Sequence, residues 1–268
     1  MSSWQLIIQQ QIVKPLQTRE GTFSLLASLG VWVLFLYYPI RKSAEALADP
    51  HSPVEGILTT LGLENLANWV LPELGAYWAL ALYVLPPFAI LVAADQMISE
   101  RLRGGLRFLL LRAKREEIFF GRFTGQLIIQ LLLIIATIFS ATLMGVLRSG
   151  DSGFFLHHIH TLLIAGVQLF IVVMPFIALM SLLSVLLNKV RTATIVAMLL
   201  FAFGESLFRW LGTKVPGLDY LALLVPGNQL SQMLNNLPMD SWALLAYPIA
   251  QTLVFMIAGY LLFRRQSV

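Results

Sequence analysis

The side chains best able to carry chemistry in this sequence are three histidines that lie within four residues of one another. His157, His158 and His160 could contribute to a copper or zinc site, because imidazole nitrogen is a good ligand for both metals. Apart from Asp151, however, no carboxylate partner is evident, and the chain has no cysteine. We therefore interpret the triplet as part of a polar interfacial loop and predict no metal site.

Two common catalytic motifs are missing from the chain. The segment from Gly204 to Leu207 places a glycine two residues before Ser206, but it lacks the closing glycine of the hydrolase elbow. No histidine lies in a neighbouring apolar segment to act as a base. A G-x-x-x-x-G-K-[ST] phosphate loop is also absent. The sequence therefore predicts a protein that is not an enzyme and that binds no cofactor itself.

Glu205 is the best-placed ionisable residue near an apolar interior. Such residues are costly in lipid and are functional candidates for that reason, and Arg209 could pair with it one helical turn later. Gln168, in another apolar segment, could line a polar route. We name Glu205, Arg209 and Gln168 as candidates for a pathway or lid. The alternatives are a headgroup-level position for Glu205 and simple helix packing for the glutamine.

The elements that must position these residues are membrane spans. Of the 268 residues, 58% are hydrophobic and 12% are charged, and the mean hydropathy is +0.78. Six segments approach the roughly 20 apolar residues that a spanning helix needs, and none alternates as a barrel strand does. We predict an all-α, polytopic single domain over residues 1–268, with spans at 22–38, 76–94, 125–147, 162–187, 192–207 and 243–262.

The distribution of basic residues predicts the orientation. If both termini are cytoplasmic, 13 of the 18 lysines and arginines lie on the inner side, as the positive-inside rule requires. The outer loops would then be 39–75 and 208–241, each with short helices. We expect a multi-pass protein of the cell membrane.

The first twenty residues predict an amphipathic helix. Trp4, Ile7, Ile8 and Ile12 recur at helical spacing among glutamines, and Pro15 closes the pattern. A signal peptide is disfavoured because the following apolar run is long and five further spans follow. We predict an interfacial helix over residues 1–20, with a frayed polar tail as the alternative.

A dense block of charge separates the second and third predicted spans, over residues 99–124. Leu102, Leu106, Leu109 and Leu110 share one helical face there, and Arg103 and Arg107 share another. A second helix is expected to begin near Lys114, with Glu116 and Glu117 in its first turn. The arginines could bind carboxylates on a protein partner or anionic lipid headgroups.

The stretch from Ser99 to Gln126, SERLRGGLRFLLLRAKREEIFFGRFTGQ, resembles the coupling-helix region of type-2 ABC transporter permeases. The usual form there is E-R-E-x-G-T-L-x-x-L-L. Arg103, Gly105 and Ala113 depart from that form, at positions where an acid, threonine and proline are common. The six spans, the first helix, the interrupted fifth segment and the Phe-Arg-Arg ending add to the likeness. The resemblance implies a coupling helix that docks an ATPase through Glu100, Arg101, Arg103, Gly104, Leu106, Arg107, Leu110 and Arg112.

The function implied by the resemblance is that of a permease subunit of an ATP-driven ABC exporter in a bacterial inner membrane. ATP and Mg would then be bound by a separate ABC ATPase subunit. The other implied partners are a second permease copy or a related permease, together with membrane lipids, and no nucleic acid. The alternatives are a mechanotransmitting or assembly subunit of an ABC-type complex and an ATPase-independent secondary transporter. An apolar bundle with few internal charges fits lipid, glycan, drug, peptide and metal-related cargo equally.

Overall fold

The computed structural model describes residues 3–17, 30–42, 69, 72–95, 97–102, 104–150, 154–215, 218–238 and 241–266. Within these ranges the chain is helical, with turns and no β-strand. Five helices in the described ranges are long and apolar enough to cross a membrane. They are α5 (Pro72–Val92), α8 (Arg115–Ser149), α9 (Phe154–Leu186), α10 (Val190–Gly212) and η5 with α12 (Trp242–Leu245 and Ala246–Arg265). The chain is thus an all-α polytopic membrane protein, as predicted.

Five of the six predicted spans coincide with these helices. The exception is the first, 22–38, because only its second half lies among the described residues. That half belongs to a helix from Gly30 to Ile40, which ends in a π-helical turn, η1 (Leu36–Ile40), around Pro39. Proline cannot donate the regular helical hydrogen bond, which is consistent with the wider turn at this point.

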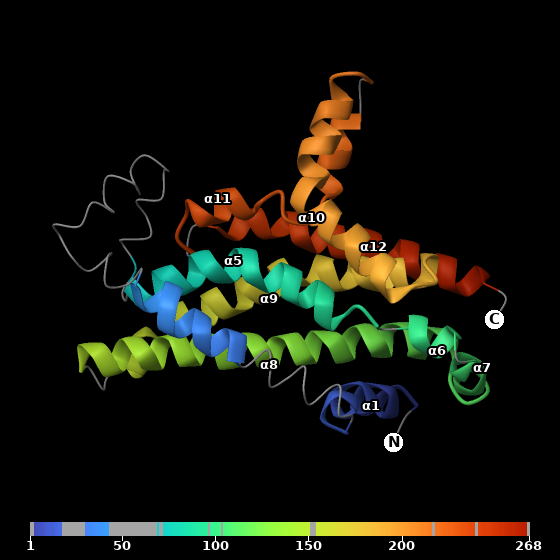
Figure 1. Ribbon diagram of the computed structural model, residues 1–268, viewed down its shortest axis with the longest axis horizontal. Helices are drawn as coiled ribbons and strands as arrows, with labels where there is room; N and C mark the ends of the chain where they lie inside the picture. The colour runs from blue at the N-terminus through green and yellow to red at the C-terminus, as the bar shows by residue number, and fades with distance from the viewer. Residues whose placement is uncertain are drawn as a thin grey trace.

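The bundle is built around α9. This helix is apolar on all sides, which is typical of a buried helix, and it packs against α12, α8, α5 and α10. Figure 1 shows α5, α8, α9 and α12 side by side along the long axis of the molecule. Trp78 of α5 and Leu169 and Phe176 of α9 are fully buried in the resulting core.

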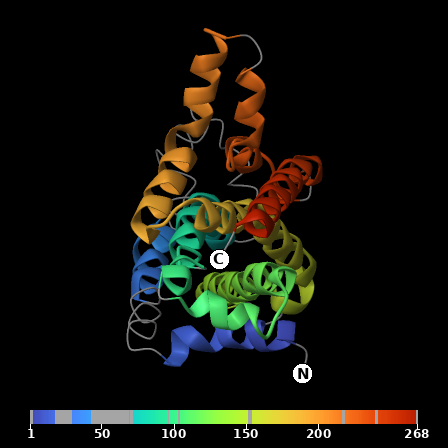
Figure 2. The same cartoon turned by 90° about the vertical axis from the view of Figure 1, so that its right-hand side faces the viewer.

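Helix α10 departs from this arrangement. It leaves the bundle obliquely, so that its last turns project beyond the other helices (Figures 1 and 2). The 3₁₀ helix η3 (Leu218–Leu224) packs against α10 and leads back towards the bundle. The short helix α11 (Leu230–Leu234) then contacts α5. Helix α10 runs without a break through Gly204 and Glu205, beyond the predicted end of the fifth span at residue 207, and the short helices follow after it.

Candidate functional site

The charged block between α5 and α8 forms two short helices at one end of the bundle, here called the α6–α7 end (Figure 1). They are α6 (Ile98–Leu102) and α7 (Gly105–Leu110). Gly104 separates them with φ +74°, a left-handed conformation that costs glycine little and other residues much more. Our expectation of one helical face formed by the leucines from 102 to 110 is therefore wrong. Leu106 is buried, whereas Leu102 is 65% exposed.

An ion pair ties α6 to α8. The carboxylate of Glu100 accepts a hydrogen bond from Nη2 of Arg122, whose side chain is only 4% exposed. A guanidinium so deeply buried needs a partner, because an unpaired buried charge is strongly destabilising. Glu100 therefore holds α6 against α8 and is directed into the protein.

Arg101, the next residue, ties α6 to the turn between α9 and α10. Its guanidinium donates to the carbonyl of Val185 at 2.8 Å, to the carbonyl of Leu187 and to Oδ1 of Asn188 at 2.6 Å. The last carbonyls of a helix have no partner within the helix, so Arg101 satisfies groups that α9 leaves open. Its contacts are internal to the chain.

Arg115, at the start of α8, does the same for α12. It donates to the carbonyls of Phe263 at 2.9 Å and Gln266 at 2.6 Å, and it lies over the Phe263 ring. The sequence analysis missed this role. The sequence does place a basic residue at the start of the third predicted span, and the last predicted span ends on the same predicted side of the membrane. It does not show that the two meet, because Arg115 and Phe263 are 148 residues apart.

The predicted start of α8 near Lys114 is confirmed. Helix α8 begins at Arg115, and Glu117 in its first turn accepts a hydrogen bond from the backbone N–H of Lys114 at 2.9 Å. This contact satisfies a donor just before the helix. It fixes where the charged block ends and the long spanning helix begins.

The surface that α7 presents to solvent is both basic and apolar. Arg107 and Arg112 are exposed, and between them Phe108 is 74% and Leu111 is 83% exposed. Leu110 is half-buried. We call Arg107, Phe108, Leu111 and Arg112 the α7 surface. The predicted docking residue Arg103 lies outside the described residues.

The eight residues named from the resemblance thus divide by position. Arg107 and Arg112 face solvent, Leu106 anchors α7 in an apolar cluster, and Gly104 forms the turn. Glu100 and Arg101 bind neighbouring helices. Phe108 and Leu111 were missed as surface residues, although a phenylalanine within a charged segment was visible in the sequence.

The N-terminal helix also packs at this end. Helix α1 (Ser3–Gln17) lies along the start of α8, and Ile7 and Gln11 are buried there. Two glycines on α8 make the contact possible. A Cβ at Gly125 would lie 2.9 Å from Cβ of Gln11, and a Cβ at Gly121 would lie 3.1 Å from Cγ2 of Ile7. The amphipathic pattern therefore marks a helix that packs against the protein as well as facing away from it.

Among the described residues, the structure brings two of the three pathway candidates together and places the third elsewhere. Glu205 and Arg209 form an exposed ion pair of 2.9 Å on α10. Gln168 is fully buried in α9, and its Nε2 donates to the carbonyl of Pro238. The glutamine therefore ties α9 to the segment before η5.

No metal site is formed by the described histidine and acidic side chains. Across the residues that the structure describes, no three His, Asp or Glu side chains gather closely enough to hold a metal ion. The side chain of His157 is not among those described. His160 is exposed, near the start of α9.

The comparisons with known proteins give one assignment. No curated protein matches the chain significantly. One family model matches residues 71–268, from the start of α5 to the end of the chain, and leaves out α1 and the first predicted span. Because this match covers most of the sequence, the chain belongs to the family described as protein of unknown function, DUF2705.

Proposed function

We propose that this chain is the permease subunit of an ATP-driven transporter of the ABC class, with ATP and Mg bound by a separate ATPase subunit. The observation that carries the proposal is the construction of the α6–α7 end. A short helical pair between two spans is fixed internally by Glu100 and Arg101, while it exposes the α7 surface. Exposed aromatic and arginine side chains are typical of protein contacts.

The internal bonds give a route by which a partner could move the spans. A displacement of α6 would act on α8 through the Glu100 and Arg122 pair and on the turn between α9 and α10 through Arg101. Of the five long described helices, α10 packs least against the others, so it could change its tilt with the least loss of packing. Binding and release of ATP on the partner would thus be converted into movement of whole helices.

The proposed orientation places the α6–α7 end and both termini in the cytoplasm. The basic residues of that end support it, since a multi-pass protein concentrates lysine and arginine there. A second copy of the chain, or a related permease, is part of the proposal. Helix α10 exposes an apolar stripe at four-residue spacing that a partner could cover, formed by Ile195, Leu199, Phe203 and Leu207.

The test is purification of the tagged full-length chain from its native membranes in mild detergent. We expect a stoichiometric ATPase subunit to co-purify, and we expect Arg107→Glu to remove it. The change places an acid beside Arg112 and cancels the net positive charge of the α7 surface, and no side-chain bond of Arg107 is seen within the described chain. Arg265→Glu is the matched control, since Arg265 is exposed at the end of α12.

A chain that purifies alone, without nucleotide-dependent activity, would contradict the proposal and favour an ATPase-independent transporter. Equal retention of an ATPase by both variants would leave the coupled complex in place and would show that the α7 surface is not the docking site.

A further inference from the structure

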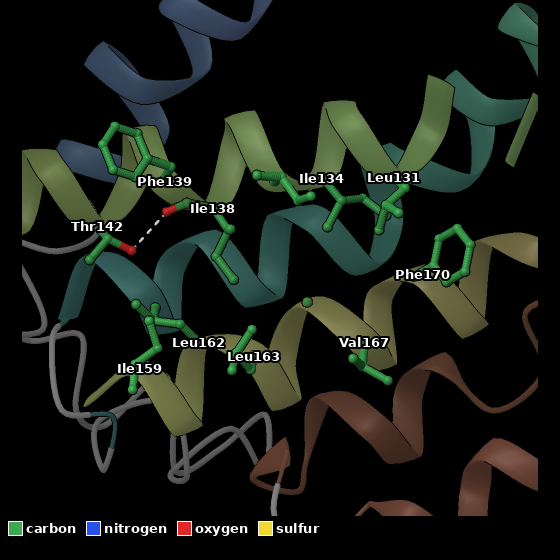
Figure 3. A pocket seen from close by; sticks show the side chains of 12 residues that line it. Leu131, Ile134, Ile138, Phe139, Thr142, Ile159, Leu162, Leu163, Val167 and Phe170 are labelled. Carbon is green, nitrogen blue, oxygen red and sulfur yellow. Dashed lines mark hydrogen bonds between the residues drawn. The ribbon is translucent and has the colours of Figure 1, made fainter. Parts of the chain in front are cut away.

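A groove of about 290 Å³ lies between α8 and α9, towards the end of the bundle opposite α6 and α7 (Figure 3). Ile134 of α8 and Leu162 and Gly166 of α9 form its floor. Two exposed ridges flank the floor, each repeating every four residues along its helix. They are Leu131, Ile135 and Phe139 on α8, and Ile159, Leu163 and Val167 on α9.

The lining of the groove offers no free polar group. Thr142 is the one polar side chain among the lining residues, and its hydroxyl donates to the carbonyl of Ile138 in its own helix at 2.7 Å. In Figure 3 this bond is the dashed line, and the side chains of Ile138 and Leu163 point towards each other across the groove. A ligand in the groove must therefore be held by apolar packing.

Gly166 leaves space in the floor that a side chain would fill. A Cβ placed on this glycine would meet no atom within 4 Å outside its own helix. Elsewhere in the molecule glycines permit close helix contacts, as Gly125 does with Gln11. At Gly166 no neighbouring atom fills the space above the glycine. The missing side chain therefore deepens the groove between α8 and α9.

The two ends of the groove differ in polarity. At one end, Leu131 and Phe170 close it with apolar side chains. Beyond the other end, the exposed His160 precedes Leu163 by one helical turn, and the exposed Ser149 follows Thr142 by two turns. An apolar slot that opens towards an imidazole and a hydroxyl, whose N–H and O–H groups can donate to phosphate oxygens, complements a phospholipid.

We propose that this groove binds an acyl chain of one membrane phospholipid, whose headgroup lies at the level of His160 and Ser149. From Leu131 to Thr142 the groove runs for roughly 16 Å along α8, about half of the ~30 Å hydrocarbon core, which suits a chain from one leaflet. The inference is independent of the proposed ATPase.

The experiment uses the full chain in vesicles of phosphatidylethanolamine and phosphatidylglycerol that contain phosphatidylcholine with a diazirine on its acyl chain. After illumination, mass spectrometry locates the lipid adducts. We expect them on the ridges of α8 and α9. Gly166→Phe should reduce these adducts by about fivefold, equivalent to ~1 kcal/mol, because the acyl chain within the groove is held by packing that the phenylalanine ring would displace.

The matched control is Leu132→Phe, which adds an aromatic ring on the exposed face of α8 outside the groove and should leave the adducts unchanged. Gly166→Leu fills less space and replaces the phenylalanine variant if that variant does not fold. Adducts spread evenly over exposed apolar residues, or unchanged in the filled variants, would overturn the proposal.

A second measurement separates a lipid from a second copy of the chain. Because the chain contains no cysteine, Leu163→Cys introduces a single thiol on the ridge of α9. Efficient disulfide cross-linking between two copies at this position would show that protein covers the groove and would also overturn the proposal. We expect the thiol to remain uncross-linked.

Discussion

The ion pair between Glu100 and Arg122 should be strongly asymmetric in its effect on stability. The Arg122 side chain is 4% exposed, whereas that of Glu100 is 25% exposed. Glu100→Gln removes the negative charge that faces the buried guanidinium of Arg122. We expect a loss of about 3 kcal/mol in the free energy of unfolding, at the lower end of the range for breaking a buried pair because water reaches one side of it.

Arg122→Met should cost much less than Glu100→Gln. Methionine fills most of the space with an apolar, flexible chain, and the carboxylate left behind can turn towards water. We expect a loss of about 1 kcal/mol or less, and the double variant should resemble Arg122→Met. Adding Arg122→Met to Glu100→Gln should therefore restore roughly 2 kcal/mol.

The assay is reversible unfolding of the purified chain by SDS in mixed micelles, followed by tryptophan fluorescence. The four proteins of the double-mutant cycle are measured at one pH and one salt concentration. Equal losses for the two single variants, or a larger loss for Arg122→Met, would refute the reasoning from burial. Two variants as stable as the original chain would show that the pair contributes nothing.

Four other substitutions have distinct expected outcomes. Gly125→Leu should detach α1 from α8, because even a Cβ there would lie 2.9 Å from Cβ of Gln11; overpacking costs typically 1–3 kcal/mol, and faster proteolysis within residues 3–17 would reveal it. Gln251→Leu should lower the Tm, since Nε2 of Gln251 donates to the carbonyl of Leu223 within η3 and to that of Val225 just after it, and an unchanged Tm would contradict this role. Leu106→Ala should destabilise the chain by about 2–5 kcal/mol, whereas Phe108→Ala, at an exposed position, should leave its thermal unfolding unchanged.

The parts of the fold that could be predicted from the sequence depend on local patterns. The length of the apolar segments predicts the five described spans, and the two acids after Lys114 predict the start of α8. Both predictions hold because each depends only on residues that are close together in the sequence. The break at Gly104 was also visible as two adjacent glycines, but the leucine spacing on both sides favoured a single helix. Here a left-handed turn overrode the periodic pattern.

The parts that could not be predicted depend on contacts between distant segments. The bonds of Arg101 reach residues more than 80 positions away, and those of Arg115 reach almost 150. From sequence alone, both arginines belonged to one exposed basic cluster. The oblique course of α10 was equally unpredictable, since apolar length permits spanning but does not set a tilt, which is decided by packing against neighbouring helices.

The neighbouring positions of Glu100 and Arg101 explain how so short a helix can connect two parts of the bundle. Successive residues on a helix point about 100° apart, so one side chain reaches α8 and the other reaches the turn between α9 and α10. Within the described part of the chain, no such side-chain bond is seen from the exposed side of α7, and Leu106 is the buried residue of that helix. If a partner displaces the α7 surface, the movement can reach α6 only through the packing of Leu106 and the turn at Gly104. Variants that uncouple the proposed transporter should accordingly occur at these internal residues as well as on the exposed surface.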